Sequence, residues 1–220
     1  MAGRSLCPVW ACLLTAKTSF VRRAPQTRTD VPYIMRLLLV RHGESEANVA
    51  QIISDDPARP VALTARGEAQ ARAVAEELRT IEFALAFASE LPRARQTAAI
   101  ILTHHACDLR IDRRLNERRS GMDGLPTHLF HQLVAPDPVH VRPPLGESFL
   151  EEIERLRAFL SDLDALPAGL NVLAVSHEDP IQAARAVAGL DPRVAVSARL
   201  ANCAMVTLER RAGRWHEPGQ

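Results

Sequence analysis

The chain has 220 residues and a formal charge of +1, from 27 basic and 26 acidic side chains. This length fits one domain of ordinary size, with or without an extension, and 47% hydrophobic residues can form a core. The balanced charge argues against a large positive face for nucleic acid, and no apolar run approaches the roughly 18 residues of a membrane-spanning helix. We therefore expect neither nucleic acid nor a membrane as a partner.

Four cysteines are scattered along the chain without C-x-x-C spacing: Cys7, Cys12, Cys107 and Cys203. Because this spacing suits neither a zinc ribbon nor a disulfide framework, a reducing compartment is the default and we expect a cytoplasmic protein. His128 and His131 are spaced by three, but no second cluster with ligand spacing accompanies them. We expect no metal site and no cofactor.

Residues 1–34 differ from the rest of the chain. They contain no acidic residue before Asp30 and show no sustained helical or alternating pattern. A secretory signal or an organelle-targeting peptide is also poor in acidic residues, but Pro8 and Trp10 interrupt the apolar stretch here. We expect a disordered or non-native extension, produced by an upstream start-site assignment, and a folded domain in residues 35–220.

The first half of this domain alternates between two periodicities. Residues 36–40 form an apolar run of strand length that stops at the charged Arg41-His42-Gly43-Glu44, as a buried parallel strand stops at a functional loop. Thr64 is a suitable N-cap for a helix that continues to about residue 80. Residues 83–88 read as a second strand, and Pro92 is a favourable first residue for the helix that follows.

The second half continues the alternation. Ser148 and Glu151 form a capping box ahead of apolar residues that step by four, three, four and three, which predicts an amphipathic helix. Residues 171–175 read as another buried strand, Asp179-Pro180 opens a helix, and residues 203–208 read as a last core strand. Strands that alternate with helices indicate an α/β domain, whose ligands lie beyond the carboxyl ends of the strands.

Histidine and arginine residues occupy the predicted strand ends. Arg41 and His42 follow the first strand, Arg93 follows the second, and His177 follows the strand at residues 171–175. Planar guanidinium groups form paired, charge-assisted hydrogen bonds with phosphate oxygens. Two arginines and two histidines that converge at one sheet edge therefore indicate a pocket for a phosphoryl group.

The residues at these positions resemble a known family. Leu39-Val40-Arg41-His42-Gly43-Glu44-Ser45 with Asn48 is similar to the signature of the histidine phosphatase superfamily, the phosphoglycerate-mutase-like proteins. Further matches follow in the family's order and extend the resemblance over about residues 35–208: Leu63-Thr64 with Gly67, Ser89-Glu90-Leu91-Pro92-Arg93-Ala94, Leu115-Asn116-Glu117 with Gly121, Gly146-Glu147-Ser148 with Arg155, Val175-Ser176-His177 and Asn202-Cys203.

The resemblance implies a fold and a set of roles. The fold would be an α/β three-layer sandwich with a mostly parallel sheet, and the nucleophile His42 would form a phosphohistidine. Arg41, Arg93, His177 and Asn48 would surround the phosphoryl oxygens and replace the usual magnesium ion. Glu117 would protonate the leaving oxygen and then accept a proton from water. The other carboxylates near the matched motifs are Glu44, Glu147 and Glu178.

The chain departs from the family pattern in two places. Glu178 stands where the family commonly has glycine. We expect its side chain to turn away from the pocket while Asp179 caps the following helix. The alternative is that Glu178 contacts a substrate hydroxyl or amine. The mutases also carry a longer insertion than residues 122–145 provide, and a short lid suits hydrolysis better than retention of an intermediate.

These observations predict a metal-independent phosphomonoesterase that acts on a small phosphorylated metabolite, with catalytic residues Arg41, His42, Arg93, Glu117 and His177. The alternatives are a phosphoglycerate-mutase-type phosphotransferase and a protein that binds phosphorylated ligands without turnover. The resemblance leaves open whether the protein is a homodimer. Arg155 and Gly67 are interpreted as structural.

Overall fold

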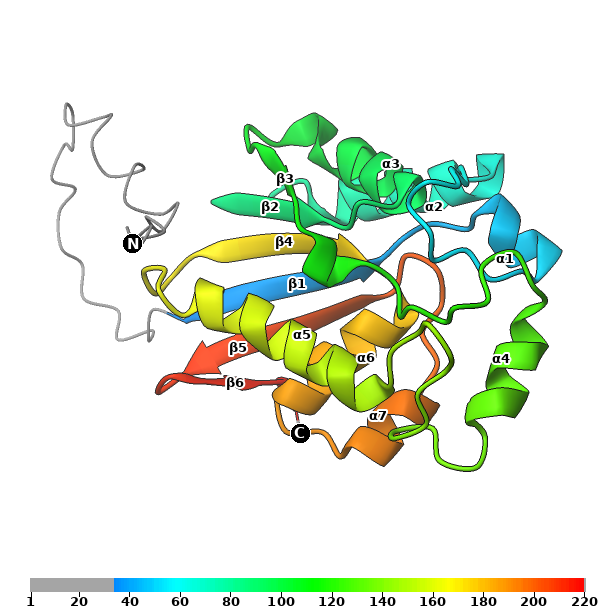
Figure 1. Cartoon of the computed structure of the whole chain (residues 1–220). Helices are drawn as coiled ribbons and strands as arrows, with labels where there is room; N and C mark the ends of the chain where they lie inside the picture. The colour runs from blue at the N-terminus through cyan, green and yellow to red at the C-terminus, as the bar shows by residue number, and fades with distance from the viewer. Residues whose placement is uncertain (1–33, 220) are drawn as a thin grey trace, which may run out of the picture. The chain divides into compact units, whose positions relative to one another are not determined.

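The computed structural model describes residues 34–219, so the extension predicted for residues 1–34 lies almost entirely outside the described residues. The order of elements along the chain is shown in Figure 1. The strands are β1 (Met35–Arg41), β2 (Leu85–Ala88), β3 (Leu109–Ile111), β4 (Asn171–Ser176), β5 (Met205–Arg211) and β6 (Arg214–His216). The helices are α1 (Glu46–Ala50), α2 (Ala65–Leu78), α3 (Pro92–Ile101), η2 (Leu102–His104), η3 (Arg113–Leu115), α4 (Thr127–Val134), α5 (Phe149–Leu163), α6 (Glu178–Val187) and α7 (Pro192–Ser197).

The strands form one sheet in the order β3-β2-β4-β1-β5-β6. The first four of these are parallel, with Leu39 of β1 opposite Ala174 of β4, whereas β5 runs antiparallel to β1 and β6 antiparallel to β5. Parallel strands carry their carboxyl ends to the same edge of a sheet. That edge is the one beside α1 and α4 in Figure 1.

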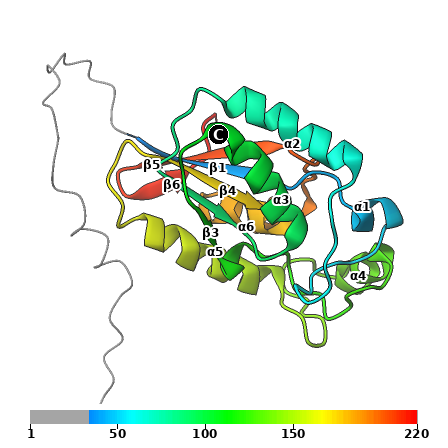
Figure 2. The same cartoon turned by 90° about the horizontal axis from the view of Figure 1, so that it is seen from above.

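Helices cover both faces of the sheet, which gives the three layers expected from the family resemblance (Figure 2). Leu38 and Val40 of β1 pack with α2 and α3 in one apolar cluster. Leu37 and Leu39 point to the opposite face and pack with α5, α6 and α7 in a second cluster. The alternation along a strand places successive side chains on opposite faces, and burial of both faces explains why residues 36–40 read as a continuous apolar run.

The predicted elements are found with small differences at their ends. The helix after the capping box is α5, in which the Ser148 and Glu151 side chains make the reciprocal cap hydrogen bonds. The expectation that Asp179 caps the next helix is wrong. The chain leaves β4 at His177, which occupies the cap position of α6, so Asp179 lies inside the first turn.

Among residues 34–219, every helix is too short or too polar to span a membrane.

Candidate active site

A pocket of about 160 Å³ opens at the carboxyl edge of the sheet. Its walls come from loops and helix ends that are far apart in the sequence: the turn after β1, α1, the loop that follows it, α4 and the start of α6. The lining side chains that carry charge or can ionise are Arg41, His42, Arg93, Glu117, Arg118, His131, Glu178, Asp179 and Arg199. The predicted residues Arg41, His42, Arg93, Glu117 and Asn48 are therefore brought to one pocket.

His42 lies at the base of this pocket and is 2% exposed. Its Nδ1 is 2.7 Å from the carbonyl oxygen of Gly43, and its Nε2 accepts a hydrogen bond from Arg93 Nε at 3.0 Å. Because a carbonyl only accepts, the ring proton is assigned to Nδ1 and a lone pair to Nε2. Burial, and then the neighbouring Arg93 charge, lower the pKa of His42 well below its usual value. The imidazole is therefore neutral at physiological pH.

Two glycines fix the turn that carries His42. A Cβ atom on Gly43 would collide with the backbone of Gly67, and one on Gly67 would collide with the backbone of Glu44. The Gly43 N–H also donates to Thr97 Oγ1 at 3.1 Å, and Thr64 caps α2 through the Gly67 N–H. The strand end that holds His42 thus packs backbone to backbone against the first turn of α2.

Arg93 enters from the first turn of α3 and is 3% exposed. Besides its hydrogen bond to His42, its Nη1 donates to Ser54 Oγ at 3.1 Å and its Nη2 to the Ser54 carbonyl at 2.8 Å. Burial lowers the pKa of Arg93 to about 10. The side chain remains a cation at neutral pH, and Ser54 fixes the plane of its guanidinium.

His177 follows β4 and lies behind His42. The two ring centroids are 4.9 Å apart at an interplanar angle of 60°. His177 Nε2 is 2.7 Å from Ser89 Oγ, and its Nδ1 is buried without a partner among the described residues. Burial and the Arg93 charge lower its pKa well below the usual value. His177 is fully buried and, unlike the other predicted phosphate ligands, does not line the pocket itself.

Asn48 lies in α1 and is fixed by a capping box. Its Oδ1 accepts from the Ser45 backbone N–H at 3.0 Å, from the Ser45 hydroxyl, and from Asn202 Nδ2 at 3.2 Å. Asn202 also donates to the His42 carbonyl at 3.1 Å. These contacts use the oxygen of Asn48, so its Nδ2 remains the donor end of a residue that lines the pocket.

Glu178 turns toward the pocket, so the expectation that it faces away is wrong. Its Oε2 is 3.1 Å from Arg41 Nη1, and its Oε1 accepts from the Leu200 backbone N–H at 2.9 Å. The helix begins two residues earlier than expected, at Glu178 instead of Pro180, and this brings the Glu178 side chain to Arg41 at the end of β1. The Glu178 carboxylate is therefore paired with Arg41, which the sequence predicts to bind phosphate.

Glu117 follows η3, and its carboxyl group lines the pocket. Its Oε1 accepts from the Arg118 N–H at 3.0 Å. Burial, and then the negative charge of Asp179, raise the pKa of Glu117 to about 7. A carboxyl group with this pKa holds a proton for much of the time near neutral pH, which a general acid requires.

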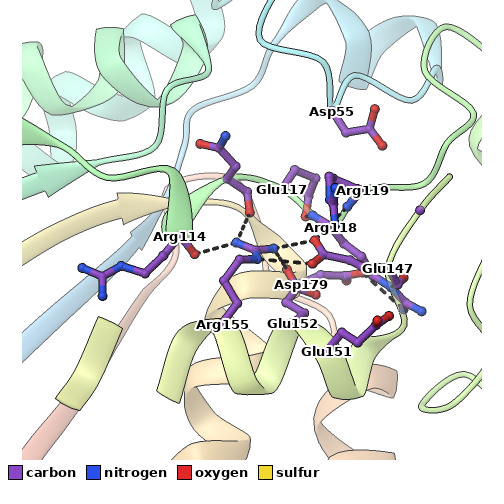
Figure 3. Close-up of polar contacts among 12 residues, drawn as sticks. Asp55, Arg114, Glu117, Arg118, Arg119, Glu147, Glu151, Glu152, Arg155 and Asp179 are labelled. Carbon is purple, nitrogen blue, oxygen red and sulfur yellow. Dashed lines mark hydrogen bonds and ion pairs between the residues drawn. The ribbon is translucent and has the colours of Figure 1, made fainter. Parts of the chain in front are cut away.

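A network of charged side chains supports the loop before Glu117 (Figure 3). Arg155 of α5 donates through Nη1 to the carbonyl oxygens of Arg114 and Asn116, and through Nη2 to Glu147 at 2.8 Å and Glu152 at 3.0 Å. Arg155 thus ties α5 to the loop, as its structural interpretation predicts.

Two of the alternative acids are held away from the pocket. Glu147 Oε1 accepts from the Arg119 N–H at 3.0 Å and pairs with Arg155. Glu44 Oε1 accepts from Thr64 Oγ1 at 2.9 Å. Neither residue lines the pocket, whereas Glu117 and Glu178 do.

Several pocket residues were not predicted from the sequence. Ser54 lies in a loop without regular structure, and Arg199 lies in the segment before β5. Phe130 and His131 reach the pocket from α4, where the sequence analysis placed only a short lid. The part of the chain that the structure describes holds no group of three or more His, Cys, Asp or Glu residues that could bind a metal ion.

Comparisons with known proteins agree with this arrangement. A family model of the histidine phosphatase superfamily (branch 1) matches residues 37–217. A protein of Enterobacter sp. (strain 638) named probable phosphoglycerate mutase GpmB is 33% identical over 195 residues, which cover 84% of this chain and 90% of that protein.

Solved structures of phosphatases share the fold. The alpha-ribazole phosphatase from Shigella flexneri superposes with a TM-score of 0.72 at 27% identity and covers 83% of this chain and 94% of its own. The mycobacterial glucosyl-3-phosphoglycerate phosphatase in complex with VO3 gives a TM-score of 0.72 at 25% identity and covers 84% of this chain and 98% of its own. The matched region includes the whole pocket, and this chain therefore belongs to the histidine phosphatase superfamily.

Proposed function

We propose that this protein is a metal-independent phosphomonoesterase that hydrolyses small phosphorylated metabolites through a phosphohistidine on His42. The observation that carries the proposal is the pairing of two neutral groups in one pocket. His42 presents an unprotonated Nε2 beside Arg93, and Glu117 retains a proton up to about pH 7. A nucleophile and a general acid are thus in opposite protonation states at the same pH.

In the first step, His42 Nε2 attacks phosphorus and the bond from phosphorus to the ester oxygen breaks. Glu117 gives its proton to that oxygen, so the leaving group departs as an alcohol. Arg41 and Arg93 contribute positive charge around the phosphoryl oxygens and Asn48 contributes a neutral donor. When the Ser89 hydroxyl donates to His177 Nε2, the neutral imidazole carries its proton on Nδ1. This Nδ1–H has no partner among the described residues and is a further donor to the phosphoryl group.

In the second step, water attacks the phosphorus of the phosphohistidine. Glu117 takes a proton from this water, the bond from phosphorus to Nε2 breaks, and inorganic phosphate leaves. The imidazole returns to its neutral form and Glu117 to its protonated form. One difficult displacement is therefore divided into two steps that share the same acid and base.

Hydrolysis is favoured over transfer by the short lid. Among the described residues, the 122–145 segment contributes Thr127, Phe130 and His131 of α4 to the pocket. A mutase must exclude water while it retains its intermediate, and this short segment suits that task less well. The names of the two structural relatives also include the word phosphatase. A phosphoglycerate-mutase-type phosphotransferase is the second candidate, because the curated relative carries that name.

The test is phosphate release from a panel of small phosphoesters in the presence of EDTA, with the unsubstituted chain and His42→Ala. We expect release by the unsubstituted chain only, and a phosphohistidine detectable by intact mass after an alkaline quench. If EDTA abolished activity and one divalent ion restored it, metal independence would be wrong. Conversion between phosphoglycerate isomers that requires a bisphosphate primer would favour the mutase.

A further inference from the structure

Glu178 is the residue at which this chain departs from the family pattern inside the pocket. A carboxylate beside a phosphate site would ordinarily repel the ligand, since two like charges at short range in a partly dry site disfavour each other. Glu178 is nevertheless 16% exposed in its side chain and is paired with Arg41 at 3.1 Å. Its contacts suggest a different effect on the ligand.

The hydrogen bond and the ion pair that the structure shows for the Arg41 side chain both use Nη1. Nη1 meets Glu178 Oε2 and donates to the carbonyl oxygen of Leu200. Nε, on the other side of the guanidinium, is buried and has no hydrogen-bond partner among the described residues. A buried donor without an acceptor costs free energy, and such groups are ordinarily satisfied by a ligand or water. The Nε edge of Arg41 is therefore the edge available to an anion.

The Glu178 carboxylate is itself fixed at both oxygens. Oε1 accepts from the Leu200 N–H at 2.9 Å while Oε2 meets Arg41. The backbone is equally constrained, because Glu178 is the first residue of α6 and follows the buried His177. Both oxygens have partners in the protein, and these fix the orientation of the carboxylate beside Arg41.

We propose that Glu178 is a positioning residue that holds Arg41 by Nη1 and so presents its Nε edge to the phosphoryl group. This inference rests on the proposed function, in which Arg41 binds phosphoryl oxygens. Glu178 could instead compete with the phosphate as an anion or contact the substrate, and only the positioning role acts through Arg41. A competing anion would weaken phosphate binding with or without Arg41, and a substrate contact would depend on the leaving group.

A double-mutant cycle separates these roles. The substitutions are Glu178→Gln, Arg41→Ala and both together, with kcat and KM measured for p-nitrophenyl phosphate, whose leaving group has no amine or aliphatic hydroxyl. We expect Glu178→Gln to lower kcat/KM about tenfold when Arg41 is present, a loss equal to about 1.4 kcal/mol. In the Arg41→Ala background the same substitution should change kcat/KM by less than about twofold, since coupled residues are not additive.

The control is Glu46→Gln, which removes one negative charge from the exposed first turn of α1. We expect it to leave kcat/KM unchanged. Glu178→Asp, which keeps the charge but shortens the reach to Arg41 and Leu200, should show a partial loss. Thermal unfolding of each variant establishes that it is folded under the assay conditions.

Three outcomes would overturn the inference. A higher kcat/KM in Glu178→Gln would identify Glu178 as an anion that competes with phosphate. An equal loss of kcat/KM with and without Arg41 would identify a role that is independent of Arg41. An unchanged kcat/KM would show that Glu178 does not affect the reaction. If the unsubstituted protein released no phosphate, the proposed function would fail first. Calorimetric titration of inorganic phosphate into the same four proteins would then test the coupling of Glu178 to Arg41 separately.

Discussion

At the scale of single residues, burial sets the protonation states on which the proposed reaction depends. The imidazole of His42 loses its hydration and has a lowered pKa, which leaves Nε2 free of a proton. The half-buried Glu117 lines the same pocket, where loss of hydration raises the pKa of its carboxyl group to about 7. Removal of water disfavours the charged form of each group, so one environment shifts a base and an acid in opposite directions.

The activity should therefore fall as the pH rises above about 7. The general acid must carry a proton in order to give it to the leaving oxygen. The fraction of protonated Glu117 decreases as the pH rises through its pKa of about 7. Burial is the main cause of that value and the Asp179 charge is the next. Asp179→Asn removes this charge, so the alkaline limb of a kcat/KM profile should move to lower pH.

The matched control is Glu154→Gln, because Glu154 lies on the exposed side of α5. Its profile should coincide with that of the unsubstituted protein. An alkaline limb that stayed in place in Asp179→Asn would contradict the assignment of Glu117 as the group that titrates.

Ser54 provides a second test at this scale. Its hydroxyl accepts from Arg93 Nη1 at 3.1 Å, and its carbonyl accepts from Nη2. Ser54→Ala removes only the first of these hydrogen bonds, so Arg93 keeps its place but loses part of its orientation. We expect KM for a phosphoester to rise about fivefold, the effect of about 1 kcal/mol, with a smaller change in kcat. Ser197→Ala, which alters an exposed hydroxyl on α7, should leave both constants unchanged.

The pocket residues that stand at strand ends were predictable from the sequence, whereas those that orient them were not. Arg41, His42 and Arg93 stand beside strand ends and belong to motifs. Ser54 contacts Arg93 across a separation of 39 residues, from a loop without periodicity. No local pattern encodes such a contact, because it depends on how the loop crosses the sheet edge.

At the scale of elements, α5 is important for its internal charges as much as for its apolar face. Glu152 is fully buried, and one of its oxygens, Oε2, has no partner among the described residues. Burial raises its pKa well above the usual value, although Arg155 acts in the opposite direction. The helix therefore carries a carboxyl group that the fold disfavours in its ionised form.

Glu152→Gln should alter how stability depends on pH. Since the folded protein binds this proton more tightly than the unfolded chain, the free energy of unfolding falls as the pH rises above about 4.5 through the raised pKa. Glutamine cannot ionise, so the variant should lose less stability over this range and exceed the unsubstituted protein by on the order of 1 kcal/mol above neutral pH. Below about pH 4 the two should agree.

The measurement is urea unfolding at a series of pH values, with Glu154→Gln as the exposed control. If both glutamine variants showed the same pH dependence as the unsubstituted protein, folding would not shift the pKa of Glu152 and the prediction would be wrong. If Glu152→Gln instead lost stability relative to the unsubstituted protein as the pH rose, Glu152 would be ionised in the fold and stabilised by Arg155. The midpoint difference between low and high pH decides this directly.

The predicted elements were those with strong periodicity or caps. α5 has both, and its residues 149–163 follow directly from the capping box and the apolar steps. The elements that escaped prediction are short: α1, η2, β3, η3, α4, α7 and β6. Pieces of three to eight residues form because tertiary contacts hold them, so their sequences carry little signal of their own.

At the scale of the whole molecule, the direction of the strands explains why the pocket could be anticipated. Parallel strands deliver their ends to one edge, so residues after β1, β2 and β4 had to meet there. The order β3-β2-β4-β1-β5-β6 was not predictable, because several orders place the same ends at the same edge. The walls from α4 and Arg199 depend on that order and were therefore missed.

We propose that a chain that begins at Met35 folds and acts like the full chain. β1 starts at Met35, whose side chain is 1% exposed and which lies opposite Arg210 of β5. Every strand and helix of the described residues is retained in such a chain. Its thermal midpoint and its kcat/KM should match those of the full chain, and a lower midpoint would show that residues 1–34 stabilise the domain.

The backbone contact between Gly43 and Gly67 has a consequence for how this protein can evolve. Each position excludes a side chain because of the backbone of the other turn, so a change at one glycine cannot be compensated by a change at the other. Random mutagenesis of these two codons should return glycine alone among active clones. New specificities must therefore arise in the outer walls of the pocket, while the turn that carries His42 is inherited without alteration.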